Sequence, residues 1–293
     1  MSGSERHMEQ LTPTLSGRSH RSAAAGAPLV IAIHGGTYTS AYFDLPGRSL
    51  LAAAAANGIP IAAIDRPGYG NSAMLAADRM DIIGQAAFLT DALSELWERF
   101  GLDCLGMVLI GHSIGAAIAA TIASAPGRLP LLGLALSGVG LTTAPGDFER
   151  WRALPDIPLV AMPSEIKDQV MFGPVGSYDA DMPAAGHAAN APAPKAELLA
   201  ITGAWHLTAK EVLGRIAVPV HYRQAEHDRL WIVDEAEVCG FAAALSAAPM
   251  VDARMMLGTG HCIDHHRVGP ALNLQQLGFA VECAARAKRA KRY

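Results

Sequence analysis

The sequence has few cysteines and no long apolar run. Its four cysteines are Cys104, Cys239, Cys262 and Cys283. They form no C-x-x-C pair, so we expect neither a zinc site nor the disulfide framework of a secreted protein, and the pattern fits a reducing cytosol. Gly, Pro and charged residues interrupt the Ala-rich segments before any of them reaches the length that spans a bilayer. The sequence therefore predicts a cytoplasmic protein without a membrane partner.

Charge is also scarce. Charged residues make up 17% of the 293 residues and the net charge is −4, so nothing favours a nucleic-acid partner. The basic run at 286–292 is interpreted as the solvated end of a last helix, where cations face the negative pole of that helix. Residues 1–27 are polar and rich in Ser, Gly and Ala, without a signal-peptide core, and we expect them to form a flexible arm.

Apolar runs and helical patterns alternate along the rest of the chain. Strands are expected at 28–33, 59–64, 107–110, 131–136, 218–222 and 252–257, and the first three of them as buried strands. Helices are expected at 47–57, 80–100, 116–120, 233–247 and 270–289. This alternation predicts an α/β fold with a mostly parallel central sheet and helices on both faces. In such sheets, ligands bind at the carboxyl ends of the strands.

The alternation stops between residues 142 and 210. Many prolines interrupt short helical stretches there, and Gly-Pro and Ala-Pro pairs mark loops. We expect a mainly helical cap or lid over the sheet in this stretch, which we call the cap segment. It would be inserted between two parts of one core, 28–141 and 211–293.

The segment Gly111-His112-Ser113-Ile114-Gly115 follows an apolar run and precedes an Ala-rich stretch. A G-x-S-x-G pattern between a buried strand and a helix is typical of a nucleophile elbow, where the chain turns sharply at the serine. Glycine on both sides lets neighbouring elements approach where a Cβ would clash. Ser113 is therefore the predicted nucleophile.

A serine hydroxyl needs an adjacent base at neutral pH, and the base needs a carboxylate that fixes its tautomer. His261 is the predicted base because it follows the strand at 252–257, in a turn of small residues. Asp228 is the predicted acid because it follows the preceding strand and reaches the same edge of the sheet. Glu226 and Asp264 remain alternatives for the carboxylate.

The tetrahedral intermediate of such a reaction carries an oxyanion, which preorganised N–H groups stabilise. We expect one donor at the backbone of Ile114, directly after the nucleophile. The other donor is expected from the loop that begins His34-Gly35-Gly36, with Gly36 favoured and Thr37 next. Further candidates for contact with substrate are His34, His112, Trp205 and His206.

No metal or cofactor is expected. His265 and His266 lie near His261 in the sequence, but no acidic or thiol cluster completes a metal site at ligand spacing. The expected partner is a small-molecule substrate, and the oligomeric state stays open.

The order Ser113, Asp228, His261 resembles the nucleophile–acid–histidine order of the α/β-hydrolase superfamily. The resemblance runs from about 28 to 285, and it rests also on the loop at 34–36 and on D-R-P-G-Y-G-N-S at 65–72. The last segment is similar to the capped branch with esterases, epoxide hydrolases, dehalogenases and C–C bond hydrolases. Epoxide hydrolases and dehalogenases have Asp as nucleophile, so Ser113 argues against both, whereas cofactor-free perhydrolases also use serine. The elbow with the following Ala resembles that of editing thioesterases.

The resemblance implies a serine hydrolase that cleaves an ester or thioester of a small to medium apolar acyl group through an acyl-enzyme. A lyase, a cyclase or a C–C bond hydrolase on the same scaffold is the alternative. A ligand receptor without catalysis is a further alternative.

Overall fold

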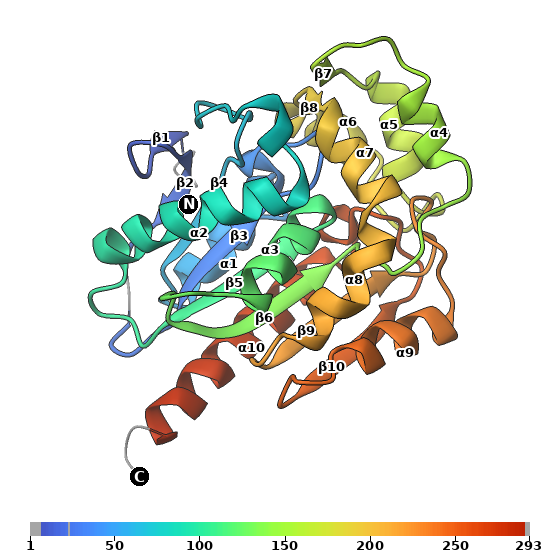
Figure 1. Cartoon of the computed structure of the whole chain (residues 1–293). Coiled ribbons are helices and arrows are strands. Elements are labelled where there is room, and N and C mark those ends of the chain that lie inside the picture. Colours follow the sequence, from blue (N-terminus) through green and yellow to red (C-terminus); the bar gives the residue numbers. More distant parts are fainter. Residues whose placement is uncertain (1–6, 23, 291–293) are drawn as a thin grey trace.

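A central eight-stranded sheet runs through the computed structural model, which describes residues 7–22 and 24–290 (Figure 1). The strand order is β1-β2-β4-β3-β5-β6-β9-β10, and neighbours from β4 to β10 are parallel. The strands of this sheet are β1 (Glu9–Gln10), β2 (Ser16–His20), β3 (Leu29–Ile33), β4 (Ile61–Ile64), β5 (Met107–His112), β6 (Leu131–Ser137), β9 (Val220–Ala225) and β10 (Val251–Met256).

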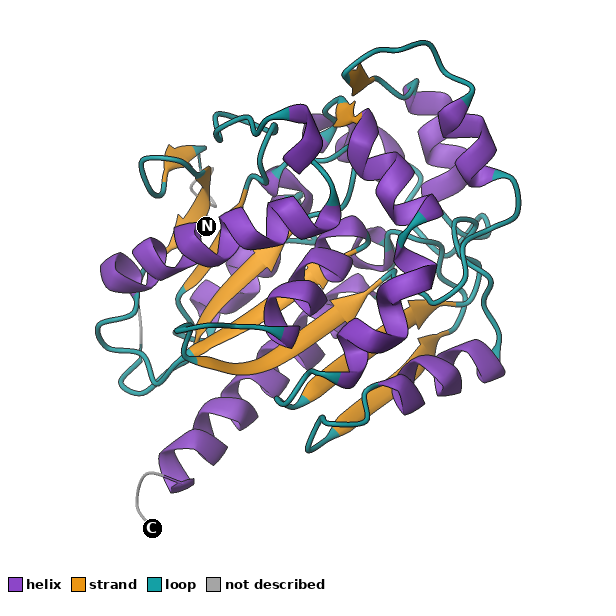
Figure 2. Ribbon diagram, viewed as in Figure 1, coloured by secondary structure: helices purple, strands orange, loops and turns teal. Residues whose placement is uncertain are grey.

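Helices cover both faces of the sheet (Figure 2). Outside the cap segment, the α-helices of the described residues are α1 (Leu50–Ala56), α2 (Ile82–Phe100), α3 (Ile114–Ser124), α9 (Glu235–Ala244) and α10 (Gly269–Ala290). Successive side chains of a strand point to opposite faces. Val30 and Ala32 accordingly pack in the core that α1 and α10 cover, whereas Leu29 and Ile31 pack in the core beneath α2 and α3. The predicted α/β fold, with a mostly parallel sheet between helices, is confirmed.

The element boundaries follow local capping more closely than the hydropathy pattern. Helix α1 begins three residues later than the expected position 47, because the Ser49 side chain accepts the Ala52 N–H and caps the helix. Strand β9 begins after Pro219 and continues to Ala225, which is farther than the expected end at 222. Asp228 is therefore the third residue after the end of this strand.

The expectation that residues 1–27 form a flexible arm was wrong for much of the part that the structure describes. Strand β2 pairs with β4 in antiparallel register, and Leu11 and Leu15 are fully buried in the main core. The Ser16 hydroxyl donates to buried Asp65, and this hydrogen bond allows the polar Ser16 side chain to be buried as well. The pattern was missed because Ser-Gly-Arg-Ser-His has no apolar alternation. Residues 1–6 and 23 lie outside the described part.

The cap segment is mainly helical and lies above the carboxyl ends of the central strands (Figure 1). Its elements are α4 (Asp147–Arg152), β7 (Leu159–Val160), α5 (Ser164–Met171), α6 (Met182–Gly186), β8 (Ala193–Pro194), α7 (Lys195–Gly203) and α8 (Trp205–Gly214). Strands β7 and β8 pair with each other, and α4 packs on α7. Helix α8 packs on α3, and its buried residues belong to the main core.

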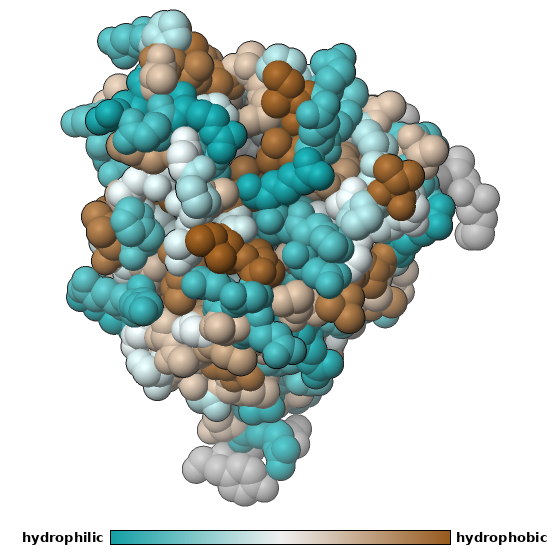
Figure 3. Space-filling model, turned by 90° about the vertical axis from the view of Figure 1, so that its right-hand side faces the viewer, coloured by the Kyte–Doolittle hydropathy of each residue, from teal (hydrophilic) through white to brown (hydrophobic). Residues whose placement is uncertain are grey.

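The outer surface mixes polar and apolar side chains. On the face shown in Figure 3, apolar residues form several separate patches among hydrophilic ones, as is normal for a surface in contact with water. Within residues 7–22 and 24–290, no helix combines the length and apolar character that crossing a membrane requires.

Candidate active site

Ser113 lies at a sharp turn between β5 and α3. Its backbone has φ 56° and ψ −124°, a left-handed conformation that costs energy for a residue with a side chain. The flanking glycines make this turn possible: a Cβ on Gly111 would lie 2.6 Å from Ala116 Cα, and one on Gly115 would lie 2.2 Å from Ile33 O. The sequence therefore builds a strained turn that holds the serine side chain at the edge of the sheet.

His261 and Asp228 form a buried hydrogen-bonded pair. His261 Nδ1 donates to Asp228 Oδ2 over 2.7 Å. The Asp228 carboxylate also accepts from Gln224 Nε2 at 3.1 Å and from the Leu230 N–H at 2.9 Å, which fixes its orientation. With its proton on Nδ1, the imidazole has Nε2 free to accept a proton.

The pair lies beside the elbow. The His261 ring is 4.9 Å from the ring of His112, the residue before Ser113. Within the described part of the chain the Ser113 hydroxyl makes no hydrogen bond, and such hydrogen bonds often tighten only in the substrate complex. The structure thus places the His261–Asp228 pair next to the residue that precedes Ser113, at the same edge of the sheet.

The two alternative carboxylates have other partners. Glu226 accepts the Gly258 N–H at 2.6 Å and lies near the exposed His227. Asp264 is buried and accepts from the Tyr42 hydroxyl at 2.8 Å. Burial raises the pKa of Asp264 to about 6. Since the hydrogen bond to His261 comes from Asp228, the geometry favours Asp228 as its partner.

Three backbone N–H groups were candidates for the two expected oxyanion donors, and their hydrogen bonds differ. Those of Gly36 and Ile114 have no acceptor within the described residues, and both residues line a pocket with Ser113. The Thr37 N–H instead donates to the Tyr69 hydroxyl at 3.2 Å. The expectation that Thr37 could donate to the oxyanion was therefore wrong, since its N–H already has an acceptor. Gly36 and Ile114 remain the candidates.

The pocket at Ser113 holds about 530 Å³ of empty space, its opening to solvent included. Most of its wall is apolar, and the polar groups besides Ser113 and Thr37 are Thr143, Asp147 and Thr202. The apolar side chains come from α3, the cap segment and the loop after β9: Ile114, Trp151, Met162, Met171, Leu198, Ile201, Leu230 and Trp231. Such a pocket suits an apolar group next to the nucleophile.

The expected substrate contacts lie outside this pocket wall. His34 is fully buried, where its Nε2 accepts the Arg66 N–H at 3.1 Å. His112 stacks on Tyr42 with ring centroids 4.6 Å apart. Burial lowers the pKa of both histidines well below the ordinary value, so both are neutral. In the cap segment, Trp205 is buried against the core and donates to Gly140 O, and His206 is exposed on α8.

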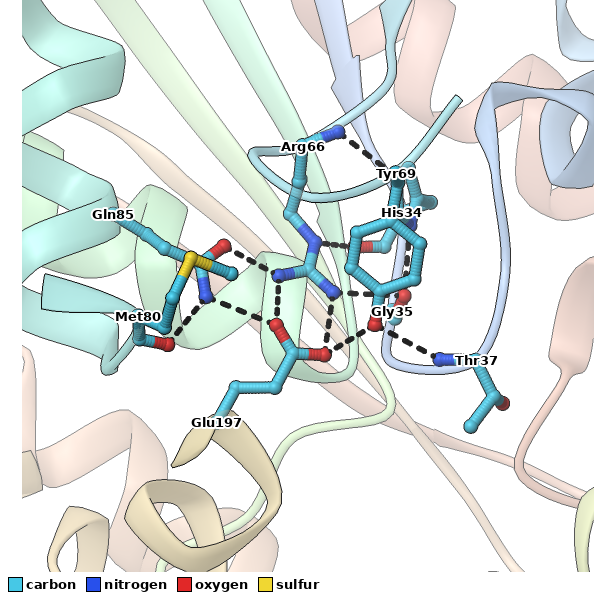
Figure 4. A network of polar contacts seen from close by, with 8 residues as sticks. All are labelled: His34, Gly35, Thr37, Arg66, Tyr69, Met80, Gln85 and Glu197. Carbon is cyan, nitrogen blue, oxygen red and sulfur yellow. Dashed lines mark hydrogen bonds and ion pairs between the residues drawn. The ribbon is translucent and has the colours of Figure 1, made fainter. Parts of the chain in front are cut away.

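A buried polar network beside the pocket was not predicted (Figure 4). Glu197 of α7 forms an ion pair with Arg66, and both side chains are fully buried. Gln85 and Tyr69 complete the network. Arg66 and Tyr69 belong to the D-R-P-G-Y-G-N-S segment that the sequence singled out. No local signal pointed to Glu197, because it lies 131 residues from Arg66 along the chain.

A second buried basic side chain binds the same loop. Lys167 of α5 donates through Nζ to Thr37 O at 2.6 Å and to Asn190 Oδ1. Its Nζ also lies 3.2 Å from the centroid of the Tyr38 ring. Burial lowers the pKa of Lys167 to about 7.

No cluster of three or more His, Cys, Asp or Glu side chains in 7–22 and 24–290 has the arrangement of a metal site. His265 and His266 are buried and bind backbone groups: His265 Nε2 donates to Tyr42 O, and His266 Nε2 accepts the Gly260 N–H. These histidines therefore support the loop that carries His261.

Comparison with known proteins agrees with this architecture. The sequence profile of the alpha/beta hydrolase family matches residues 30–268. The chain belongs to the alpha/beta hydrolase family. As a member of it, the protein is an enzyme of the hydrolase type, and a small-molecule substrate fits this class. No curated protein sequence matches this alpha/beta hydrolase significantly.

Solved structures of low sequence identity share the fold. A thermophilic esterase from Thermogutta terrifontis is 17% identical, with 95% of this chain and 100% of that chain covered and a TM-score of 0.65. A thioesterase domain from the curacin biosynthetic pathway is 16% identical, covering 93% and 99%, with a TM-score of 0.64. A haloalkane dehalogenase from Bradyrhizobium elkanii is 17% identical, covering 96% and 98%, with a TM-score of 0.62. These neighbours have different activities, so the similarity describes the scaffold of this alpha/beta hydrolase.

Proposed function

We propose that the protein is a serine hydrolase that cleaves an ester or thioester through an acyl-enzyme. The observation that carries this proposal is the buried His261–Asp228 pair beside the strained turn at Ser113. Free N–H groups at Gly36 and Ile114 add a place for the oxyanion. Nucleophile, base, orienting acid and oxyanion donors are the parts that acyl transfer needs.

The reaction would proceed in two halves. Ser113 Oγ attacks the substrate carbonyl while His261 Nε2 takes the hydroxyl proton, and the carbonyl oxygen becomes an oxyanion facing Gly36 and Ile114. His261 then protonates the leaving alcohol or thiol, which leaves an acyl group on Ser113. In the second half His261 Nε2 takes a proton from water while the water oxygen attacks the acyl carbon. His261 then returns this proton to Ser113 Oγ as the bond to the acyl carbon breaks and the acid leaves.

The cap segment would choose the acyl group. Its side chains Trp151, Met162 and Leu198 form much of the apolar wall at Ser113. Methionine adapts to ligands of different shape because its side chain is flexible and polarizable.

Substitution of the nucleophile tests the mechanism. The wild-type protein is expected to hydrolyse p-nitrophenyl esters of short and medium acids and to be labelled by a fluorophosphonate. Ser113→Ala should lose both properties and keep its circular dichroism spectrum. Undiminished turnover by Ser113→Ala would exclude a covalent serine.

Within this proposal, a thioester substrate is distinguished from an oxygen ester by its own observations. It is favoured by the G-H-S-x-G-A elbow at 111–116 and by structural similarity to the curacin thioesterase domain. A panel of p-nitrophenyl esters and acyl thioesters with the same acyl chain separates the two by their kcat/KM ratio. Turnover in H₂¹⁸O distinguishes either one from a lyase, because only hydrolysis places the label in the acid product.

A further inference from the structure

The peptide between Gly35 and Gly36 is anchored from behind. Its carbonyl, Gly35 O, accepts from Arg66 Nη2 at 3.0 Å and from His34 Nδ1 at 2.7 Å. A trans peptide is planar and its C=O and N–H point in opposite directions. Holding Gly35 O toward Arg66 therefore turns the Gly36 N–H away from Arg66. Gly36 lines the pocket with Ser113, so this N–H is the expected oxyanion donor.

The next peptide is held in the same way. The Thr37 N–H donates to the Tyr69 hydroxyl, and Tyr69 in turn donates to Glu197 Oε1. Burial first, and then the Glu197 carboxylate, raise the pKa of Tyr69 well above its ordinary value, so the phenol keeps the proton that it donates. Thr37 itself has φ 63°, a conformation that persists only where the surroundings hold it.

Arg66 and Tyr69, which hold the two peptides, both donate hydrogen bonds to Glu197 (Figure 4). Its carboxylate accepts from Arg66 Nη1 at 2.7 Å, from Arg66 Nη2 at 3.1 Å and from Gln85 Nε2 at 2.9 Å, besides Tyr69. The remaining Arg66 N–H groups donate to His34 O, Gly35 O and Gln85 Oε1. Every donor of the guanidinium is used, so its position is fully determined.

The arrangement is costly if its only role is stability. Two charges buried together often stabilise a fold no better than apolar side chains of the same volume. Glu197 does not line the pocket, but the next residue, Leu198, does. The ion pair therefore links a helix of the substrate pocket to the loop that carries the Gly36 N–H.

We propose that Glu197 is a positioning residue that, through Arg66 and Tyr69, aims the Gly36 N–H at the oxyanion. This inference rests on the proposed acyl transfer at Ser113. Because an oxyanion donor acts in the transition state, misorienting it lowers kcat and leaves ground-state binding nearly unchanged. A purely structural role would lower the melting temperature without this kinetic signature.

The first test is Glu197→Gln, which keeps the shape but removes the charge that holds Arg66. Loss of one oxyanion donor costs about 10²–10³-fold in kcat, so partial misorientation should cost roughly 10- to 100-fold, with KM changed less than about 3-fold. Affinity for a trifluoromethyl ketone, which forms a tetrahedral adduct with Ser113, should fall by the same factor as kcat/KM. Asp252→Asn is the matched control, since it removes the carboxylate beside another buried guanidinium, Arg223, away from the pocket.

A second variant covers the case in which Glu197→Gln fails to fold. Arg66→Met combined with Glu197→Met leaves no unpaired buried charge, yet it removes the donors to His34 O and Gly35 O. A positioning role predicts that the double variant folds and keeps a low kcat. Tyr69→Phe keeps the ion pair and should lower kcat more modestly, because only the Thr37 N–H is released.

The outcomes separate this inference from the proposed function. If the wild type hydrolyses acyl esters, Ser113→Ala does not, and Glu197→Gln and the double variant keep kcat within about 3-fold, the positioning role is refuted and acyl transfer stands. If the wild type is inactive on every ester and thioester, both are overturned. A parallel fall of kcat and of affinity for the trifluoromethyl ketone supports both.

Discussion

Asp228→Asn should nearly abolish turnover while the fold remains intact. Oδ2 of Asp228 accepts from both His261 Nδ1 and Gln224 Nε2, and Oδ1 accepts the Leu230 N–H. An asparagine has one oxygen for these donors. If the oxygen stays on the Leu230 N–H, the new NH₂ group faces His261 and forces the proton from Nδ1 to Nε2. His261 in that tautomer cannot accept the Ser113 proton.

The neighbourhood tolerates this exchange. Gln224 Oε1 is buried without a hydrogen-bond partner among the described residues, so a half-turn of the Gln224 amide lets it accept from the new NH₂ group. Stability should therefore change little. A wrong tautomer lowers kcat by about 10³- to 10⁴-fold, which corresponds to ~4–5.5 kcal/mol of transition-state stabilisation.

The assay is the initial rate of p-nitrophenyl butyrate hydrolysis from pH 5 to 9, with a thermal melt of each variant. The matched control is Asp264→Asn, which changes another buried carboxylate that accepts from Tyr42 and not from His261. It should keep kcat within about 3-fold. A loss below 10-fold in Asp228→Asn, or an equal loss in Asp264→Asn, would refute the assigned role of Asp228.

Three further substitutions have defined outcomes. Gly36→Ala places a Cβ 2.8 Å from Ile114 Cδ1, so kcat should fall about 10-fold or more with little change in the melting temperature; an unchanged kcat contradicts Gly36 as donor. Burial lowers the pKa of Lys167 from 10.5 to about 7, so the unfolding free energy of the wild type should rise as the pH rises from 7 to 10. Urea titrations of Lys167→Met should show a smaller rise over this pH range. The same rise in Lys167→Met and in the wild type would argue against a buried amine. Burial raises the pKa of Asp264 to about 6, so the folded state binds this proton up to a higher pH than the unfolded state, and the unfolding free energy falls as the pH rises from about 4 to 6. Asp264→Asn should remove this fall. If the fall persists in urea titrations of the variant, another group causes it.

Signals confined to neighbouring residues were the ones that sequence reasoning could use. The strained turn at Ser113 is encoded by adjacent glycines, and strand ends place Asp228 and His261 at the same edge as the elbow. Continuous apolar runs predicted the parallel sheet because strands covered on both faces have little polar character.

Features that depend on distant partners were missed. Strand β2 is polar, and its place in the sheet is set by pairing with β4 and by the hydroxyl of Ser16 on Asp65. Trp205 was expected at the substrate because it lies in the cap segment, but its helix packs on α3. Glu197 was not singled out, since its ion pair with Arg66 becomes visible only in the folded chain.

The two roles of helix α7 have a consequence for protein engineering. Leu198 and Ile201 line the pocket. Glu197, one residue before Leu198, holds the loop of Gly36 through its ion pair with Arg66. Replacing α7 by a foreign helix to broaden the substrate range would remove the ion pair of Glu197 with Arg66 together with the pocket residues. Lys167 gives α5 a similar double task, because the same helix carries Met171. Libraries that vary Leu198, Ile201 and Met171 while keeping Glu197 and Lys167 should therefore yield more active variants than exchange of whole helices.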